Sequence, residues 1–258
     1  MIDHVSPAPD EPVFEVELED PIGRSTLHRM ASVDRYNGWI FQEIAPYAGQ
    51  RLLEVGCGIG NMTVYFRHLS LVVGLDLLQS SVVYVTQHLA DYPNIRIHRG
   101  DITSANTVAQ LMPYAFDTVM CLNVLEHIRD DSLALHNMAD LLQPGGHLLL
   151  FVPAGMYMFG SLDVALGHHR RYEKQELHQL VEAADLEIIR FGHLNISGIP
   201  GWWLNSRLLK RQILPHGQLK LFNRLAPILI TCERQLRRVW DMPIGQSLLC
   251  IARKRTFV

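Results

Sequence analysis

A glycine-rich segment that follows a short apolar run constrains the fold of this chain more than any other feature. The run Arg51–Val55 leads directly into Gly56, Gly58 and Gly60, which are spaced two residues apart. Glycines at this spacing let the backbone turn sharply and approach a ligand closely, while the N–H groups of a following helix face that ligand. The segment therefore predicts a strand, a ligand-binding loop and a helix over about Asn61–His68.

Short apolar runs alternate with helical patterns along most of the chain. Apolar residues at helical spacing predict helices at Asp34–Ala45 and Ser80–Tyr92. Further strands are expected at Leu71–Leu75, Ile95–Ile97, Phe116–Cys121, His147–Val152, Leu186–Leu194 and Ser247–Arg253. Strands that alternate with helices form parallel βαβ units, which bind ligands at the carboxyl ends of the strands. The chain is thus expected to be an α/β protein with one mostly parallel sheet.

The last two expected strands are separated by about fifty residues, too many for a simple hairpin. This spacing predicts a helical insertion between them, and with it a division of the chain into four parts. These are a flexible lead-in (1–25), a core (26–198), the insertion (199–245) and the last strand of the core (246–258). A first helix of the insertion is expected at Trp202–Gln212.

A second helix of the insertion is predicted by apolar residues at 3-4-3-4-3 spacing, the pattern of an amphipathic helix. They are Phe222, Leu225, Leu229, Cys232, Leu236 and Val239. Pro227 lies inside this stripe, so a kink or two shorter helices are expected there. The apolar side chains of the insertion must pack on the sheet domain, on a second subunit or on an apolar substrate. We expect the insertion to close over a substrate site as a lid, and a homodimer is compatible with the same pattern.

The net charge of −3 conceals an asymmetry between two parts of the chain. Residues 1–199 hold 12 Lys and Arg against 24 Asp and Glu, whereas residues 200–258 hold 11 against 2. The second part therefore carries a net +9. This basic region is either a solvated face or a surface that meets anionic lipid headgroups or phosphorylated substrates. The slightly acidic total charge argues against a nucleic-acid partner.

Cysteine usage and the first residues of the chain both predict a cytoplasmic location. Cys57, Cys121, Cys232 and Cys250 are scattered, without a C-x-x-C pair or the spacing of a metal site. The acidic first twenty residues lack the basic start and apolar stretch of a signal peptide. No apolar run approaches the roughly 18 residues that a membrane span needs.

The chemistry around the glycines indicates which ligand the loop takes. The spacing is G-x-G-x-G, whereas the dinucleotide fingerprint is G-x-G-x-x-G and would require a glycine at Asn61. Glu54 precedes the first glycine by two residues, where a carboxylate would not help a pyrophosphate but would suit a cofactor with an ammonium and a sulfonium. Asp76 ends the second expected strand and can accept both hydroxyls of a ribose. Asp101, beside the apolar Ile102, suits an adenine; its alternative role is to cap the following helix.

In this order the segments resemble the class I S-adenosylmethionine-dependent methyltransferases. The resemblance rests on Leu53–Gly60, Asp76, Gly100–Asp101, Asn123–His127 and Leu142–Gly146, and it covers about residues 36–153. It implies a Rossmann-like seven-stranded sheet in the order 3-2-1-4-5-7-6, with the last strand antiparallel.

The same resemblance implies S-adenosylmethionine as cofactor and S-adenosylhomocysteine as product. The residues expected to bind the cofactor are Tyr36, Glu54, Gly56, Gly58, Gly60, Asn61, Asp76, Leu77, Asp101, Ile102, Leu122 and Asn123. Glu54 and the glycines would cradle the methionine moiety, whose other end Leu122 and Asn123 would flank. Asp76 would bind the ribose, and Asp101 with Ile102 the adenine.

Two further segments bear on the acceptor of the methyl group. The sequence Asn-Val-Leu-Glu-His at Asn123–His127 resembles small-molecule methyltransferases, including the ubiquinone-biosynthesis O-methyltransferases. The segment Ala165–Tyr172 resembles a bacterial subgroup linked with lipid or glycan pathways. An Asn-Pro-Pro-Tyr or Asp-Pro-Pro-Tyr motif, common where bases or glutamine are methylated, is missing after the fourth expected strand.

We therefore expect methyl transfer to an oxygen or nitrogen atom of a small, partly apolar acceptor, such as a natural product, a quinone-like or a lipid-linked molecule. A protein or nucleic-acid methyltransferase and a non-catalytic cofactor-binding module are the alternatives. The insertion could bring the enzyme into peripheral contact with an anionic membrane.

Histidines near the carboxyl edge of the sheet are the candidate proton acceptors, because histidine titrates near neutral pH. His127 follows the fourth expected strand, and His168 and His169 lie in the loop after the fifth. The alternatives are a packed residue at a helix start for His127 and a solvated loop for the other two. A metal ion is not expected, since Glu126 and His127 are adjacent and such residues cannot easily share one ion.

Overall fold

The computed structural model describes residues 20–256. Its strands form one seven-stranded sheet in the order β3-β2-β1-β4-β5-β7-β6. The strands are β1 (Arg51–Val55), β2 (Leu71–Asp76), β3 (Ile95–Arg99), β4 (Phe116–Leu122), β5 (Leu142–Pro153), β6 (Leu186–Leu194) and β7 (Ser247–Lys254). Neighbouring strands are parallel except that β7 runs antiparallel to both β5 and β6. The predicted fold class and strand order are thus confirmed.

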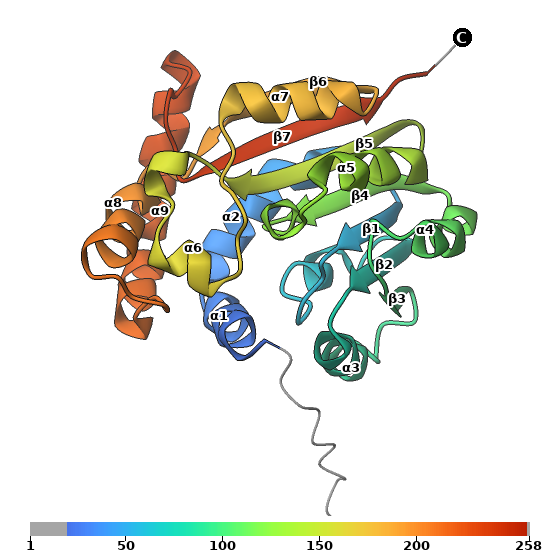
Figure 1. The fold of residues 1–258 in the computed structure, drawn as a ribbon, viewed down its shortest axis with the longest axis horizontal. Coiled ribbons are helices and arrows are strands. Elements are labelled where there is room, and N and C mark those ends of the chain that lie inside the picture. The colour runs from blue at the N-terminus through green and yellow to red at the C-terminus, as the bar shows by residue number, and fades with distance from the viewer. Residues whose placement is uncertain (1–19, 257–258) are drawn as a thin grey trace, which may run out of the picture.

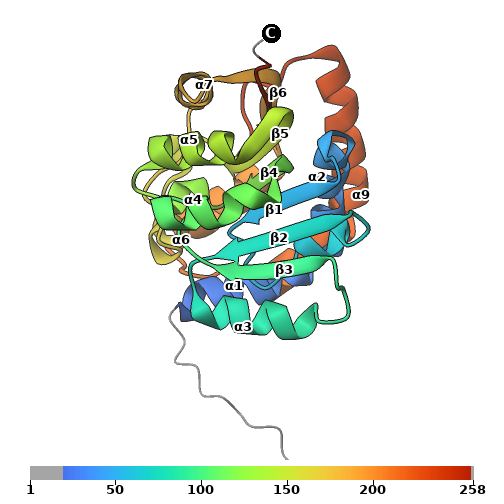
Figure 2. The ribbon, with the colours of Figure 1, turned by 90° about the vertical axis from the view of Figure 1, so that its right-hand side faces the viewer.

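Helices cover both faces of this sheet. They are α1 (Pro21–Ala31), α2 (Asp34–Ile44), α3 (Gln79–His88), α4 (Ala105–Leu111), α5 (Asp131–Leu141), α6 (Ser161–Ala165), α7 (Lys174–Ala183), α8 (Gly198–Trp203) and α9 (His216–Val239). Figures 1 and 2 show α4, α5 and α7 on one face, and α2 and α9 on the other. Shorter turns connect them: η1 (Ala45–Tyr47), η2 (Thr63–Phe66), η3 (Met112–Tyr114), η4 (Leu125–His127), η5 (Met156–Met158) and the π-helical η6 (Leu204–Leu208).

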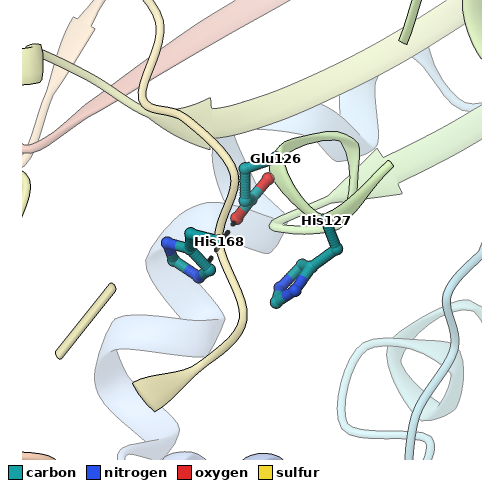
Figure 3. A group of neighbouring side chains, drawn as sticks. All are labelled: Glu126, His127 and His168. Carbon is teal, nitrogen blue, oxygen red and sulfur yellow. Dashed lines mark ion pairs between the residues drawn. The ribbon is translucent and has the colours of Figure 1, made fainter. Parts of the chain in front are cut away.

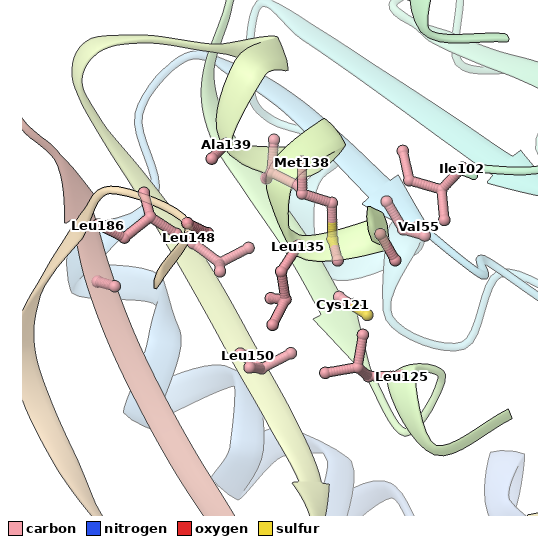
Figure 4. Close-up of a cluster of buried hydrophobic side chains, with 14 of the residues drawn as sticks. Val55, Ile102, Cys121, Leu125, Leu135, Met138, Ala139, Leu148, Leu150 and Leu186 are labelled. Atoms are coloured by element: carbon pink, nitrogen blue, oxygen red, sulfur yellow. The ribbon is translucent and has the colours of Figure 1, made fainter. Parts of the chain in front are cut away.

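The central strands are buried on both faces, which explains why they appear in the sequence as continuous apolar runs. On one face, Leu135 and Met138 of α5 pack against Leu148 and Leu150 of β5 (Figure 4). On the other face, α2 packs its apolar side against alternate residues of β1, β4 and β5. Truncating a fully buried leucine such as Leu135 to alanine would cost roughly 2–5 kcal/mol.

Three predicted elements differ from the structure. The helix expected at about Asn61–His68 is only the 3₁₀ turn η2, whose β-branched and aromatic residues have low helix propensity. Helix α1 begins inside the expected lead-in, where the carboxylate of Asp20 accepts a hydrogen bond from the N–H of Gly23 at 2.8 Å. Residues 1–19 of that lead-in lie outside the described residues. Strand β5 begins at Leu142 rather than at the expected His147, and its pairing with β4 shifts register between these positions.

The insertion is helical as predicted, but its two helices differ from the expected ones. The first is α8 (Gly198–Trp203), continued by the π-helical η6, and not a helix over Trp202–Gln212. The second, α9, is rotated about its axis relative to the predicted orientation. It is a single helix that contains Pro227, rather than two shorter helices. Phe222 of the predicted stripe does pack inward, together with Leu219, Ala226 and Ile230, which lie outside that stripe. Four other members of the stripe are exposed: Leu225, Cys232, Leu236 and Val239.

Polar contacts explain this rotation of α9. The buried carboxylate of Glu233 accepts hydrogen bonds from the backbone N–H groups of Asn195 (2.7 Å) and Ile196 (3.0 Å). Arg234 and Arg237 form ion pairs with Glu43 of α2. Apolar spacing alone cannot reveal these contacts. Between residues 20 and 256, no helix combines the length and apolar character needed to cross a bilayer.

Candidate active site

A cavity of about 620 Å³ lies at the carboxyl ends of the central strands. The glycine loop, the end of β2 and the turn after β4 form its floor, while residues of α1, α8 and α9 also line it. A volume of this size suits a small molecule. Its position at the carboxyl edge of a parallel sheet is where such folds bind ligands.

The glycine loop needs its glycines for two different reasons. Gly56 has a φ of +73°, and a Cβ there would stand 2.3 Å from a methyl group of Val124. Its N–H donates a hydrogen bond to the carbonyl of Leu75, which ties the loop to β2. Gly60, with a φ of +85°, faces Val85 of α3 and does not line the cavity. The first glycine therefore shapes the ligand site, whereas the third permits close packing of α3.

Two buried carboxylates lie beside the loop. Asp76 accepts hydrogen bonds from the N–H groups of Gly58 (2.8 Å) and Leu78 (3.0 Å). Glu54 accepts a hydrogen bond from the hydroxyl of Thr63. Burial, with a smaller contribution from the charge of Asp76, raises the pKa of Glu54 to about 8, although the bond from Thr63 opposes this. A cation bound beside Glu54 would favour its ionised form, whereas a pyrophosphate would be repelled by Asp76, so the site fits an ammonium-bearing and sulfonium-bearing cofactor.

The structure gathers the other residues predicted to bind the cofactor around the same cavity. Those that line it are Tyr36, Asn61, Leu77, Asp101, Ile102, Leu122 and Asn123. Asp101 also accepts hydrogen bonds from the N–H and the hydroxyl of Thr103, both at 2.8 Å. These bonds form a turn ahead of α4, whose N-cap is Ser104, so Asp101 lies at the cavity and does not cap that helix. Of the predicted cofactor residues, Gly60 alone lies away from it.

Helix α1 contributes to the cavity, which the sequence analysis did not predict. Gly23, Arg24, Leu27 and Met30 all line it. The pair Asp20-Pro21 is the signal that could have revealed this helix, because aspartate favours the N-cap position and proline the first turn.

On the other side of the cavity, two of the three candidate histidines lie close together. His127 belongs to η4 after β4, and His168 to the loop after α6 (Figure 3). Their ring centroids are 4.7 Å apart, and Nε2 of His168 is 3.9 Å from Oε1 of Glu126. His169 is exposed and does not line the cavity; its backbone N–H donates to the carbonyl of Glu126.

His168 is held by a buried ion pair that the sequence analysis did not identify. Oδ1 of Asp163 lies 3.0 Å from Nδ1 of His168 and 2.7 Å from Nε of Arg171. Burial alone would raise the pKa of Asp163, but the hydrogen bond from His168 and the charge of Arg171 lower it. An ionised carboxylate only accepts hydrogen bonds, so Nδ1 of His168 donates to Asp163, and in the neutral ring Nε2 is the nitrogen with the free lone pair.

Nothing in the sequence indicated that Arg171 is buried. Its side chain is 1% exposed, donates to the carbonyl of Ala154 and lies over the ring of Trp202. The polar sequence at 168–172 by itself predicts a solvated loop. Only the contact of Arg171 with Asp163 in the folded chain explains its burial.

Glu126 and His127 have unusual titration properties for their residue types. Glu126 is fully buried, and neither carboxylate oxygen has a hydrogen-bond partner within residues 20–256. Burial raises the pKa of Glu126 to about 7, against the opposing charge of His168. Enclosure by the cavity wall, followed by the charges of His168 and His169, lowers the pKa of His127 to about 4 even though its ring meets solvent on the cavity side. His127 is therefore neutral at physiological pH.

The ligand atoms of Glu126, His127 and His168 all lie within 4.8 Å of one another. Glu126 and His127 are adjacent in the sequence, yet their ligand atoms come close enough to share one ion with His168, contrary to the expectation from the sequence. The three side chains could therefore hold a cation. That the enzyme needs no metal ion stays a prediction.

Comparison with known proteins agrees with the geometry. A methyltransferase-domain family matches residues 24–190. The chain is 30% identical over 169 residues to a ubiquinone biosynthesis O-methyltransferase of Paracidovorax citrulli, covering 59% of this chain and 69% of that one. It is 28% identical over 209 residues to the protein of the same name from Idiomarina loihiensis, covering 73% and 82%.

Solved structures support the fold. A SAM-dependent methyltransferase from Archaeoglobus fulgidus aligns with a TM-score of 0.57 at 14% identity, covering 88% of this chain and 94% of that one. The [4+2]-cyclase SpnF aligns with a TM-score of 0.56 at 19% identity, covering 87% and 82%. At such identities the alignments show the fold alone. Together with the family match and the carboxylate-lined glycine loop, they lead to one conclusion: the chain belongs to the class I methyltransferases and is an enzyme that uses S-adenosylmethionine.

Proposed function

We propose that this enzyme methylates an oxygen or nitrogen atom of a small, partly apolar acceptor held between His168 and the insertion. The observation that carries the proposal is the division of the cavity into two ends. Glu54 and Asp76 line one end, whereas Met30, Leu219 and Phe222 make the other end apolar. S-adenosylmethionine, when bound, supplies a methyl group on a positively charged sulfur.

His168 is the proposed base. Its Nε2 takes the proton of the acceptor hydroxyl or amine as that atom bonds to the methyl carbon. The ionised Asp163 holds the ring through Nδ1 and stabilises the imidazolium that forms. His127 and Glu126 are proposed to contact the acceptor, because both line the cavity beside His168. His169 has no part in this proposal, since it lies outside the cavity.

The insertion is the proposed lid and determinant of acceptor choice. Trp202, Gln218 and Phe222 line the cavity, and the ring N–H of Trp202 lies 3.4 Å from Asp163. The insertion thus connects the apolar end to the proposed base. The names of the two curated relatives support a quinone-like aromatic acceptor; a natural product or a lipid-linked molecule would suit the same cavity.

Location and assembly belong to the same proposal. The four cysteines are unpaired and three are buried, which supports a reducing cytoplasm. For the insertion we propose contact with an anionic membrane, which is argued further below; a homodimer through the same surface is the alternative.

The alternatives differ in their products. A protein or nucleic-acid methyltransferase would label a macromolecule, whereas a binding module would yield no S-adenosylhomocysteine. The similarity to a protein titled a cyclase shows that this fold does not itself guarantee methyl transfer.

The test uses methyl-labelled S-adenosylmethionine with a panel of phenols, quinols and amines, and mass spectrometry of small molecules and protein. We expect S-adenosylhomocysteine to form only with an acceptor, together with one labelled small product. Label on protein or RNA would favour the second alternative. Tight cofactor binding without turnover across the panel and in cell extract would favour the binding module.

A further inference from the structure

Helix α9 is apolar on two sides, and one of these sides faces away from the protein. Five of its apolar residues are between 42% and 83% exposed: Leu221, Leu225, Ile228, Leu236 and Val239. With the exposed Cys232, these residues are spaced 4-3-4-4-3, which places them along one face of a helix. We call this set the outer stripe. Contiguous exposed apolar surface of this kind marks an interaction site.

Basic side chains border the outer stripe, and the helix presents no acidic one outward. Lys220, Arg224 and Arg238 are exposed, and helical spacing sets them along one edge of the stripe. The single acidic residue of α9, Glu233, is buried. An apolar face bordered by cations is the pattern of helices that lie in the interface of a membrane.

The exposed apolar surface continues in the residues that follow α9. Trp240 and Ile244, directly after α9, are 60% and 46% exposed, and tryptophan is favoured at the membrane interface. Figure 1 shows α8 and α9 together on the flank of the molecule farthest from α4.

The inner side of the same helix reaches the cavity. Leu219 and Phe222 line its apolar end, so α9 separates that end from whatever covers the outer stripe. If the outer stripe contacted a membrane, the proposed acceptor site would lie beside the lipid phase, where apolar molecules concentrate.

We propose that the outer stripe, with Trp240 and the bordering cations, docks the enzyme on an anionic lipid bilayer. A second copy of the chain fits this surface less well, because a two-fold contact would bring Lys220, Arg224 and Arg238 of both copies to one interface. Anionic headgroups instead neutralise these cations. Docking does not depend on the proposed function. The idea that the membrane supplies an apolar acceptor does rest on the proposed function.

The chain offers its own reporter for a test. Cys232 lies within the outer stripe and is exposed, whereas the other three cysteines are buried. An environment-sensitive fluorophore attached to Cys232 is mixed with vesicles of phosphatidylcholine alone, or of equimolar phosphatidylcholine and phosphatidylglycerol. We expect a blue shift with the anionic vesicles only, reversed by salt, and co-sedimentation of the unlabelled protein with the same vesicles.

Paired variants separate the contributions. Leu225→Gln with Ile228→Gln, and Arg224→Gln with Arg238→Gln, should each weaken vesicle affinity by about tenfold or more. Leu133→Gln and Arg67→Gln, which change an exposed leucine and an exposed arginine outside the insertion, should leave it unchanged. Circular dichroism checks that every variant is folded.

Failure to bind anionic vesicles would overturn the proposal. So would a blue shift that depends on protein concentration without lipid and coincides with dimers in sedimentation, because the stripe would then be a subunit interface. The His168→Gln variant should bind vesicles as the wild type does. Unchanged methyl transfer in this variant, with intact vesicle binding, would therefore count against the proposed function and not against docking.

Discussion

The two ends of the cavity are built in different ways. At the proposed cofactor end, most of the lining comes from residues 54–102, as the backbone of one loop and carboxylates at the ends of adjacent strands, with Tyr36, Leu122 and Asn123 added from outside that range. At the acceptor end, side chains come from α1, η4, the loop after α6 and the insertion, which are far apart in the sequence. Local chain geometry therefore determines the first end, and tertiary packing determines the second.

This difference explains what the sequence could predict. Roles could be predicted for Glu54, Gly56 and Asp76 from their positions near the ends of apolar strands. The structure places all three at one cavity. The strand order followed from the resemblance. Both depend on regularities within short segments.

The acceptor end was only partly predictable. Their positions after expected strands made His127, His168 and His169 candidates, but the Asp163–Arg171 ion pair that holds His168 exists only in the folded chain. For α9, apolar periodicity gave a helix and the wrong inward face, because Glu43 and Glu233 fix its rotation through contacts with other elements.

The largest expected effect tests the acceptor end. His168→Gln should lower kcat by about a hundredfold or more, the usual contribution of a general base, and leave cofactor affinity within about twofold. Steady-state kinetics and calorimetry with S-adenosylhomocysteine measure the two quantities. The matched control is His169→Gln, one residue away and outside the cavity, which should keep near wild-type kcat. Equal loss in both variants would mean that the loop as a whole, rather than a base, supports catalysis.

The cofactor end should respond in affinity instead of rate. Asp76→Ala removes the proposed ribose acceptor and also the partner of the Gly58 N–H, so affinity for S-adenosylhomocysteine should fall by roughly ten- to a hundredfold. Asp117→Ala is unsuitable as a control because it also holds backbone N–H groups; Asp140→Ala, on α5 and exposed, serves better. Unchanged affinity in Asp76→Ala, or tighter binding of NAD than of S-adenosylhomocysteine, would contradict the assignment of this end.

The smallest effect on chemistry comes from Glu43, which ties the insertion to α2. Glu43 is 8% exposed and pairs with Arg190 of β6 and with Arg234 and Arg237 of α9. Burial would raise its pKa, but the hydrogen bonds from Arg237 and Arg190 outweigh burial and lower the pKa from its usual 4.5 to about 2. Because the folded pKa is the lower one, this carboxylate stabilises the fold above about pH 4.5, and the stabilisation is lost as the pH falls toward 2.

Glu43→Gln should therefore lower the free energy of unfolding near pH 7 by about 3 kcal/mol, measured by urea denaturation, and flatten its loss between pH 4.5 and 2. Because the glutamine loosens α9 against the sheet, KM for the acceptor should rise a few-fold while cofactor affinity is kept. Glu187→Gln, which breaks an exposed pair with Arg253, should leave the unfolding free energy nearly unchanged. If Glu43→Gln weakened cofactor binding as much as acceptor binding, the packing of α9 would affect both ends of the cavity equally. The two ends would then differ in how well the sequence predicts them, but not in how they respond to this substitution.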